Sequence, residues 1–394
     1  MSTSIAYPPG RGGATAPRAG DPVAAAAALH DELNRRAAEA EASRQLPDDV
    51  VRSLREAGLF SLALPRRLGG READPRTIVE VVELLSHADP AAGWSVLIGQ
   101  GAGFLAWLAP EVADEIVAAT PAPIVASSFA PLPPAVPAPG GHRLAGRWPY
   151  CSVSRHADWL MGAFLAPAPG GPPMLRFGFL PASDWTVADT WDPAGLVATA
   201  SNDVAVDGAL LPERRTADPR TEAAREPGPL YRLSLFTLLR VCLAGFPLGV
   251  ARRALDEITT IVTRKSRSAS RQPLAADPLV QAELAHAEAA YQAARAGVLA
   301  VLDELWAQAQ RGEAVDPVLR ARFAASVQFA MRTALDVVES SFRIAGGGVL
   351  YRTGTLQRLW RDLQVAASHV VFGPDSVRRT GQALLGQDVP VALL

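Results

Sequence analysis

Two long apolar stripes near the end of the chain constrain the fold most. Apolar residues recur at every third or fourth position over residues 280–305 and again over residues 323–344, which is the spacing of one face of an α-helix. The short segment QRGEAVDP separates the stripes, and Asp316-Pro317 suits a helix N-cap followed by proline at the first helical position. The sequence therefore predicts two long helices that pack as an antiparallel hairpin in a helical bundle.

The rest of the chain changes its pattern twice. Residues 21–120 carry the helical spacing, whereas residues 121–227 are rich in proline and glycine and hold short apolar runs such as ADWLMGAFLA and MLRFGFLP. Short runs between Gly, Pro and Asp turns predict β-strands. The sequence thus predicts an α+β fold, with an N-terminal helical domain (21–120), a central β domain (121–227) and a C-terminal helical bundle (228–394). A Gly- and Pro-rich flexible tail over residues 1–20 precedes them.

Charge and cysteine content exclude several classes of protein. The 394 residues include 38 basic and 40 acidic side chains, a formal charge of −2, so no nucleic acid or anionic membrane is predicted as a partner. Cys151 and Cys242 lie far apart and form no CxxC pair, which argues against a disulfide framework or a zinc knuckle. Residues 1–20 show no signal peptide, so a cytoplasmic location is expected.

One uncharged segment has the length of a membrane-spanning helix. Residues 90–110 (PAAGWSVLIGQGAGFLAWLAP) carry no charge over close to the roughly 20 residues that such a helix needs. The segment contains Ser95, Gln100 and four glycines, and it lacks flanking basic residues. A helix buried inside a soluble bundle is therefore predicted.

Common catalytic motifs are absent from the sequence. It contains no GxxxxGK[ST], GxSxG or HExxH motif, and its six histidines never fall at metal-ligand spacing. Gly346–Gly348 follow a predicted helix, whereas a dinucleotide fingerprint needs a preceding strand. These observations argue against phosphate-loop, hydrolase and metal chemistry, and the three glycines are expected to end the helix.

Two segments hold residues suited to chemistry. In GRWPYCSVSRHADWL, Trp148 and Tyr150 could stack on a planar ring and Ser152 could hydrogen-bond a ring nitrogen, as a flavin isoalloxazine requires. Aromatic residues that alternate along a strand also pack a sheet face, so the residues alone leave both interpretations open. His369, on a largely apolar helical face in RDLQVAASHVV, is either a buried core histidine or a catalyst.

Nearby charged residues are given structural roles. His156 and Asp158 are expected to shape the turn after the predicted strand. Arg358 and Asp362, four residues apart, are expected to form a surface or interhelical ion pair.

The order of these segments, and several stretches within them, resemble the acyl-CoA dehydrogenase superfamily over nearly the whole chain. LPDDVVRSLREAGLFSLALPRRLGG, DTWDPAGLVATASNDVAVDG and IAGGGVLYRTGTLQRLWRD carry the resemblance. GRWPYCSVSRHADW and LQRLWRDLQVAASHVVFGP are most similar to the class D two-component flavin-dependent monooxygenases of that superfamily. The resemblance implies an N-terminal helical domain, a central β-barrel domain and a C-terminal four-helix bundle, assembled as a homotetramer.

The resemblance also implies a function. Dehydrogenases of this fold commonly have a catalytic glutamate near the C-terminal helices, but the comparable stretch here has Phe372 before Gly373. The monooxygenases have a histidine in that segment, matched by His369, and a serine after the aromatic pair, matched by Ser152. An oxygenase component is therefore expected, which hydroxylates a phenolic or other nucleophilic small molecule through a flavin C4a-hydroperoxide. An NAD(P)H-dependent flavin reductase would supply reduced FMN, or FAD as the alternative, and O2 would be the co-substrate.

Each site residue receives an expected role from the resemblance. His369 would polarise the hydroperoxide or take a phenolic proton, and Ser152 would bond the N5 region of the flavin. Trp148 and Tyr150 would line the flavin ring. Ser201 matches the serine of a Gly-Thr-Gly-Ser segment of the superfamily, and this chain has Ala198 and Ala200 at the positions of the two glycines. Arginines of a neighbouring subunit would anchor the flavin phosphate, with Arg264, Arg267 and Arg271 as candidates. Two alternatives stay open: an FAD-dependent acyl-CoA dehydrogenase with a displaced base, and a catalytically inactive relative that binds a ligand.

Overall fold

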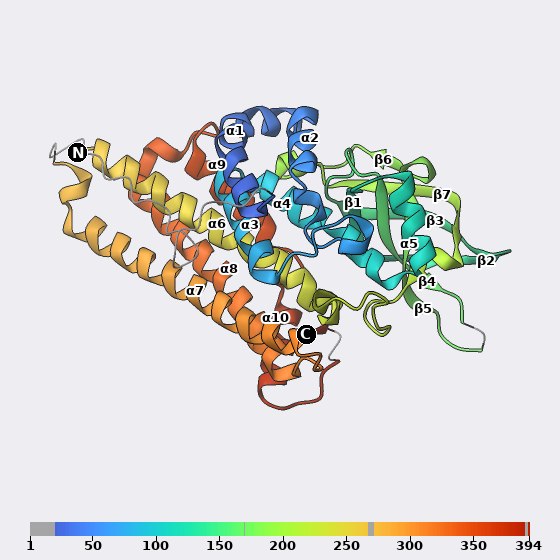
Figure 1. The fold of residues 1–394 in the computed structure, drawn as a ribbon. Helices are drawn as coiled ribbons and strands as arrows, with labels where there is room; N and C mark the ends of the chain where they lie inside the picture. The colour runs from blue at the N-terminus through green and yellow to red at the C-terminus, as the bar shows by residue number, and fades with distance from the viewer. Residues whose placement is uncertain (1–19, 169, 267–271, 391–392) are drawn as a thin grey trace.

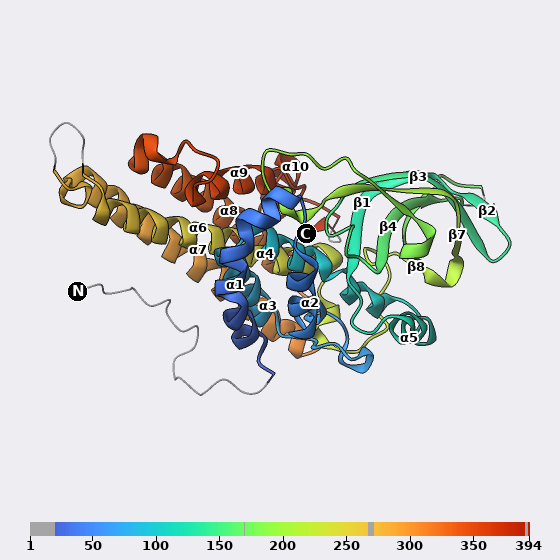
Figure 2. The same ribbon diagram turned by 90° about the horizontal axis from the view of Figure 1, so that it is seen from above.

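The structure is a computed structural model that describes residues 20–168, 170–266, 272–390 and 393–394. Bundle helices run side by side away from a pair of β-sheets; the first N-terminal helices lie along the bundle, and the last of them lies beside the sheets (Figures 1 and 2). This arrangement confirms the predicted α+β fold and its order of helices, sheets and helices.

The N-terminal helices are α1 (Pro22–Ser43), α2 (Asp48–Glu56), α3 (Pro75–Ala88), α4 (Pro90–Gly99) and α5 (Pro110–Ala119). Several helices of the chain begin at an Asp-Pro pair whose Asp side chain accepts a backbone N–H of the first turn, as predicted for Asp316-Pro317. The same start occurs in α1, α3, α4 and α7. These pairs set where the helices begin.

The strands form two four-stranded sheets. One has the order β1 (Val125–Pro134), β4 (Trp159–Ala166), β5 (Met174–Pro181) and β8 (Thr216–Ala217). The other has the order β2 (Val136–Ala138), β3 (Gly141–Cys151), β7 (Asn202–Pro212) and β6 (Thr186–Ala188). β1 and β4 pair in parallel, and the other pairs are antiparallel. The expected central β domain is confirmed, and its strands are divided between two four-stranded sheets.

The C-terminal helices are α6 (Leu235–Arg264), α7 (Pro278–Gln310), α8 (Pro317–Ala345), α9 (Thr355–Ala367) and α10 (Pro374–Leu384). The predicted hairpin is confirmed as α7 and α8, and Gly346 ends α8 with a φ of 64°. Short 3₁₀ segments occur between the longer elements, including Gly101–Trp107, Val197–Thr199 and Gly346–Val349.

Helix α6 is the core of the bundle and packs closely on α3. A Cβ added at Gly245 would lie 2.2 Å from the Val79 carbonyl oxygen, and one at Gly249 would lie 2.2 Å from that of Glu83. The glycines therefore permit the close approach of the two backbones. Among the described residues α6 alone is long and apolar enough to cross a membrane, but 94% of its most apolar window is buried, as in a core helix.

The segment 90–110 is buried as predicted. It forms the ten-residue α4 and then the 3₁₀ segment Gly101–Trp107, and almost all of it is inaccessible to solvent. Ten helical residues rise about 15 Å, which is half of a bilayer core.

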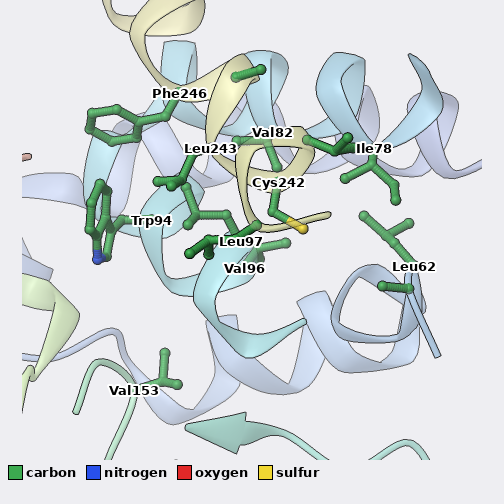
Figure 3. Packing of buried hydrophobic residues seen from close by; sticks show 14 of the residues in the cluster. Leu62, Ile78, Val82, Trp94, Val96, Leu97, Val153, Cys242, Leu243 and Phe246 are labelled. Atoms are coloured by element: carbon green, nitrogen blue, oxygen red, sulfur yellow. The ribbon is translucent and has the colours of Figure 1, made fainter. Parts of the chain in front are cut away.

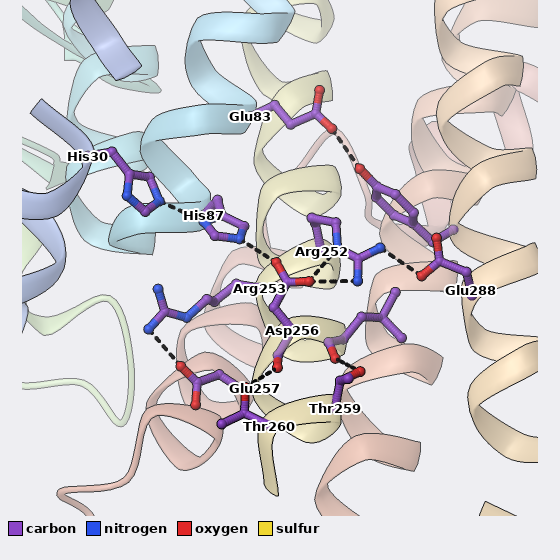
Figure 4. A network of polar contacts seen from close by, with 12 residues as sticks. His30, Glu83, His87, Arg252, Arg253, Asp256, Glu257, Thr259, Thr260 and Glu288 are labelled. Carbon is purple, nitrogen blue, oxygen red and sulfur yellow. Dashed lines mark hydrogen bonds and ion pairs between the residues drawn. The ribbon is translucent and has the colours of Figure 1, made fainter. Parts of the chain in front are cut away.

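A polar network fastens α1, α3, α6 and α7 to one another (Figure 4). His30 Nε2 lies 2.8 Å from His87 Nδ1, and His87 Nε2 lies 2.8 Å from Asp256 Oδ2. Arg252 then joins Asp256 (2.8 Å) to Glu288 (2.7 Å). No group of three or more His, Cys, Asp or Glu side chains able to hold a metal occurs in the described part of the chain.

Candidate functional site

Trp94 of α4 brings the predicted residues Ser152 and His369 together. Its indole Nε1–H donates to Ser152 Oγ at 3.2 Å, and its ring lies edge-on to the His369 imidazole with centroids 5.7 Å apart. Trp94 is 6% exposed and also packs edge-on against Phe246 of α6 at 5.1 Å (Figure 3). The N-terminal helices, the β domain and the C-terminal helices thus each contribute a side chain at one place.

The buried hydroxyl groups of Ser152, Ser201 and Thr199 form a hydrogen-bonded chain, called here the hydroxyl chain. Ser152 Oγ lies 2.7 Å from Ser201 Oγ, Ser201 Oγ lies 2.6 Å from Thr199 Oγ1, and Thr199 donates to the Leu196 carbonyl at 2.7 Å. The two ends fix the direction of the bonds, because an indole N–H only donates and a carbonyl only accepts. Each hydroxyl therefore donates toward Leu196, and Ser152 Oγ keeps one lone pair for a further donor.

The backbone around these hydroxyls is strained. Seven described non-glycine residues have a positive φ, and four of them lie in the two segments that carry the serines. These are Tyr150 (60°), Val153 (56°), Leu196 (51°) and Ala200 (46°). Left-handed conformations are unfavourable for residues with a Cβ, and they concentrate at functional sites.

His369 lies in the turn between α9 and α10, two residues beyond the end of α9 at Ala367. Its expected place on a helical face is therefore wrong, because α9 has ended and the backbone N–H of His369 bonds to the Ala366 carbonyl. Nδ1 accepts from the Val371 N–H at 3.3 Å, so Nε2 carries the proton of the neutral imidazole. Burial lowers the pKa of His369 to about 4.

Trp148 lies in the core, outside the candidate site, whereas Tyr150 is exposed and precedes Ser152 by two residues. Trp148 is fully buried between the sheets, against Gly162, and its Nε1–H donates to the Ala163 carbonyl at 2.7 Å. Its expected role as a wall of the flavin ring is therefore corrected to a core role. Tyr150 is 72% exposed and lies edge-on to Trp191, with ring centroids 6.3 Å apart.

The arginines predicted to bind phosphate are largely outside the described residues. Arg267 and Arg271 are not among them, and Arg264 ends α6 with an exposed side chain. The C-terminal end of α6 lies at the end of the bundle farthest from the sheets (Figure 1). A phosphate contact from this region to another subunit stays a prediction.

Helix α9 binds the backbone of residues 194–196, which precede the hydroxyl chain in sequence. Asp362 Oδ1 accepts from the Leu196 N–H at 2.6 Å, and Arg361 donates to the Ala194 carbonyl at 2.8 Å. Gly195 lies so close to α9 that an added Cβ would be 2.2 Å from the Arg361 carbonyl oxygen. The helix that precedes His369 therefore also positions Thr199 and the serines.

Asp362 and Arg358 differ from the expected surface or interhelical ion pair. Both side chains are buried, and Asp362 bonds to a backbone N–H instead. Burial, helped by the buried carboxylate of Asp89, raises the pKa of Asp362 to about 7. Asp89 accepts from the Ala91 N–H at the start of α4. Both carboxylates therefore accept hydrogen bonds from backbone N–H groups.

His156 and Asp158 take structural roles, in agreement with the sequence. Asp158 Oδ2 accepts from Arg55 at 2.7 Å and from the Ile124 N–H at 2.9 Å, and His156 Nε2 bonds to the Leu46 carbonyl at 3.0 Å. These bonds hold the turn after β3 to α2 and to the start of β1.

An apolar cavity of about 20 Å³ lies along α4 and α6, one helical turn from Trp94 and Phe246. Gln100, Ser127 and Cys242 are its polar members, and the other lining side chains include Leu97, Ile98, Phe104, Phe129, Leu238 and Leu239. This volume holds about one water molecule.

The groups that converge at Trp94 fit the edge of a reduced flavin ring, which presents both N–H donors and carbonyl acceptors. Among the described residues, one lone pair of Ser152 Oγ and the Nε2–H of His369 have no hydrogen-bond partner, and the surroundings are aromatic and apolar.

Comparisons with known proteins agree with this assessment. Residues 23–111 match the family described as acyl-CoA dehydrogenase, N-terminal domain, and residues 241–374 match acyl-CoA dehydrogenase, C-terminal domain. Indole-3-acetate monooxygenase from Pseudomonas putida is 31% identical over 367 residues, covering 91% of this chain and 93% of the relative. The oxygenase component of FADH2-dependent resorcinol hydroxylase from a Rhizobium strain is 30% identical over 381 residues, with coverage of 91% and 93%. The solved structure of XiaF from Streptomyces in complex with FADH2 and glycerol superposes with a TM-score of 0.87 at 27% identity, covering 93% and 95% of the two chains.

Proposed function

The chain belongs to the acyl-CoA dehydrogenase superfamily, as an oxygenase component of the two-component flavin-dependent monooxygenases, and we propose that Ser152, Trp94 and His369 form its reaction site. Such a component hydroxylates aromatic substrates and depends on a flavin reductase for reduced flavin. The observation that supports the proposed site is the contact of Trp94 with both Ser152 and His369.

Reduced flavin, when bound, would supply the activation of O2 and the transfer of one oxygen atom to the substrate. Ser152 would hold the edge of the flavin ring. Its proton is directed toward Ser201, so Ser152 Oγ acts as an acceptor and would take a hydrogen bond from the N5–H. An acceptor at that position keeps the proton on the ring nitrogen. Ser201 and Thr199 maintain this direction because their own protons point toward Leu196.

His369 would act on the substrate side. The sequence left two roles open, to polarise an oxygen or to take a phenolic proton. Since Nδ1 accepts from Val371 and the ring is neutral, Nε2–H is a hydrogen-bond donor, which favours the first role. We therefore assign His369 to donate to an oxygen atom at the reacting position.

The aromatic walls exclude water from the site. Trp94 and Phe246 are buried, and Phe372 lies edge-on to His369 with ring centroids 6.4 Å apart. A site with little water strengthens hydrogen bonds at the reacting atoms and limits side reactions.

An electron-rich ring, such as a phenol or an indole, is the proposed substrate class, and an NAD(P)H-dependent reductase is the proposed partner. The names of two relatives include FADH2 and those of two solved structures include FMN, so reduced FMN, which was expected first, and reduced FAD both stay proposals. The homotetramer stays a prediction from the resemblance.

The dehydrogenase alternative has less support, because Phe372 stands where the catalytic glutamate is usual and the buried Asp89 and Asp362 bond to backbone N–H groups.

The function is tested by supplying the protein with NADH, a flavin reductase, FAD or FMN, and either resorcinol or indole-3-acetate. We expect hydroxylated product that requires O2. His369→Ala is expected to bind reduced flavin as the wild type does but to lose most of the product. His286→Ala is the matched control, because His286 is exposed on α7. Oxidation of an acyl-CoA thioester without O2 would support the dehydrogenase alternative, and an undiminished yield from His369→Ala would exclude His369 from the reaction.

A further inference from the structure

Arg240 of α6 is a buried cation that lacks a counter-ion in the described residues. It is 2% exposed. Its Nη2 donates to Ser376 Oγ at 3.2 Å and to the Leu393 carbonyl at 3.3 Å, while Nε and Nη1 find no partner in the described chain. The guanidinium carbon lies 6.0 Å from the centre of the Phe236 ring.

Three other arginines of the chain that are buried or largely buried are paired with acids. Arg252, Arg295 and Arg361 lie 2.7, 2.8 and 2.6 Å from Glu288, Glu83 and Glu41, respectively. The charged group that interacts with Arg240 is instead Arg379, and burial together with this repulsion lowers the pKa of Arg240 to about 10. A buried charge without a partner destabilises a fold, and such groups concentrate where a ligand binds.

Arg240 is connected to the turn that carries His369. Ser376 Oγ, which accepts from Arg240, also accepts from Gln328 Nε2 at 3.1 Å, and Gln328 bonds to the Val371 carbonyl at 3.4 Å. The N–H of Val371 is the group that donates to His369 Nδ1. The guanidinium therefore lies behind one wall of the proposed reaction site.

Arg240 is also connected to the apolar cavity. The Phe236 ring contacts Phe129, with centroids 6.2 Å apart, and Phe129 lines the cavity together with Leu239, the neighbour of Arg240 on α6. Phe236 thus contacts both Phe129 at the cavity and the guanidinium of Arg240.

We propose that Arg240 is an anion-binding residue of the substrate site and that the aromatic substrate carries a carboxylate. The inference rests on the proposed function for the location of the site. A carboxylate would supply the missing counter-ion and would accept from the unpartnered N–H groups. A neutral analogue would leave them unsatisfied, so the residue would select for acids.

Two ligands that differ only in a carboxylate or a neutral carboxamide group test the proposal. Indole-3-acetate and indole-3-acetamide share the ring and the side chain, and calorimetry would measure their binding to the flavin-free protein and to its anaerobic complex with reduced FAD. We expect the wild-type protein to bind the acid at least tenfold more tightly than the amide. In Arg240→Gln the two affinities are expected to fall within about twofold of each other, whereas Arg240→Lys retains a preference for the acid.

Thermal melting provides a second readout. Arg240→Gln removes an unpaired buried charge, so its melting temperature without ligand is expected to equal or exceed that of the wild type. Indole-3-acetate should raise the melting temperature of the wild type and not that of Arg240→Gln. Arg320→Gln is the matched control, because Arg320 is a partly buried arginine with an unpartnered Nε in the described structure, and this variant should behave as the wild type.

Equal binding of the acid and the amide by the wild type would overturn the proposal, as would an acid preference that survives in Arg240→Gln. A melting shift from sodium acetate equal to that from indole-3-acetate would also overturn it, since the site would then recognise any small anion. O2-dependent hydroxylation of indole-3-acetate by the wild type, supplied with reduced flavin, tests the proposed function separately, because it measures the reaction and not the preference for acid over amide.

Discussion

His369 is expected to stay uncharged well below neutral pH, and the size of the effect follows from its burial. The pKa of the imidazole is lowered from 6.5 to about 4. At pH 6 an ordinary histidine is about three-quarters protonated, whereas a group with a pKa of about 4 is about 1% protonated. Hydroxylation that depends on neutral His369 should therefore lose little of its kcat/KM between about pH 8 and pH 6 through this residue.

The same change in pKa predicts how stability depends on pH. The lowered pKa means that the unfolded chain binds a proton between pH 6.5 and about 4 and the folded chain does not. The stabilisation that His369 gives as a neutral group is fully present above pH 6.5 and is lost as the pH falls toward 4. A shift of this size corresponds to at most about 3 kcal/mol of unfolding free energy. His369→Gln should remove this contribution.

NMR titration of isotope-labelled histidines is the direct assay. Burial also lowers the pKa of His30 and His156, so the signal of His369 is assigned by its loss in His369→Gln. Urea denaturation at pH 7 and near pH 4 would measure the linked stability. A titration midpoint for His369 at 6 or above, or parallel pH dependence of stability in the two proteins, would refute the reasoning.

Three further predictions concern the groups around the site. Ser152→Ala should release a several-fold larger share of the consumed O2 as H2O2, measured with catalase in an oxygen electrode; an unchanged share would contradict the proposed acceptor role. Gly195→Ala should lower the unfolding free energy by about 1–3 kcal/mol in urea denaturation because its Cβ would lie 2.2 Å from the Arg361 carbonyl oxygen. The control Gly297→Ala has nothing within 4 Å of the added atom and should stabilise α7 by about 0.5–1 kcal/mol; similar effects of both substitutions would oppose the close contact. The pKa of Asp362 is raised to about 7, so the wild type should lose stability relative to Asp362→Asn as the pH rises from 4 to 8, by at most about 4 kcal/mol; a constant difference would argue against a protonated Asp362.

The sequence predicted best the features that repeat along the chain. The apolar spacing of residues 280–305 and 323–344 predicted the α7–α8 hairpin, because helix faces are determined by local periodicity. The lack of charge over residues 90–110 likewise predicted burial of α4. The short runs between turn residues predicted the central β domain, but the order of its strands in two sheets depends on contacts between distant segments.

Site residues were harder to predict because tertiary contacts determine them. Trp94 lies in a segment whose sequence predicts only a buried helix, and its hydrogen-bond partner Ser152 lies 58 positions away in the chain. Trp148 shares its strand with the candidate residue Tyr150, but Gly162, on β4 of the other sheet, gives the indole ring room in the core. Asp362 has the spacing of a surface ion pair, and only the packing of Leu196 on α9 shows that it is buried.

The most direct test of the account follows the oxygen atoms of O2. Reduced flavin, an aromatic substrate and ¹⁸O2 would be mixed for a single turnover with wild-type protein, His286→Ala and His369→Ala, and the label would be measured in product and in H2O2. We predict one ¹⁸O atom in the new hydroxyl group of the product from the wild type and the control, and most of the label in H2O2 from His369→Ala. Product without ¹⁸O from the wild type, or a full yield of labelled product from His369→Ala, would contradict the assignment of this site.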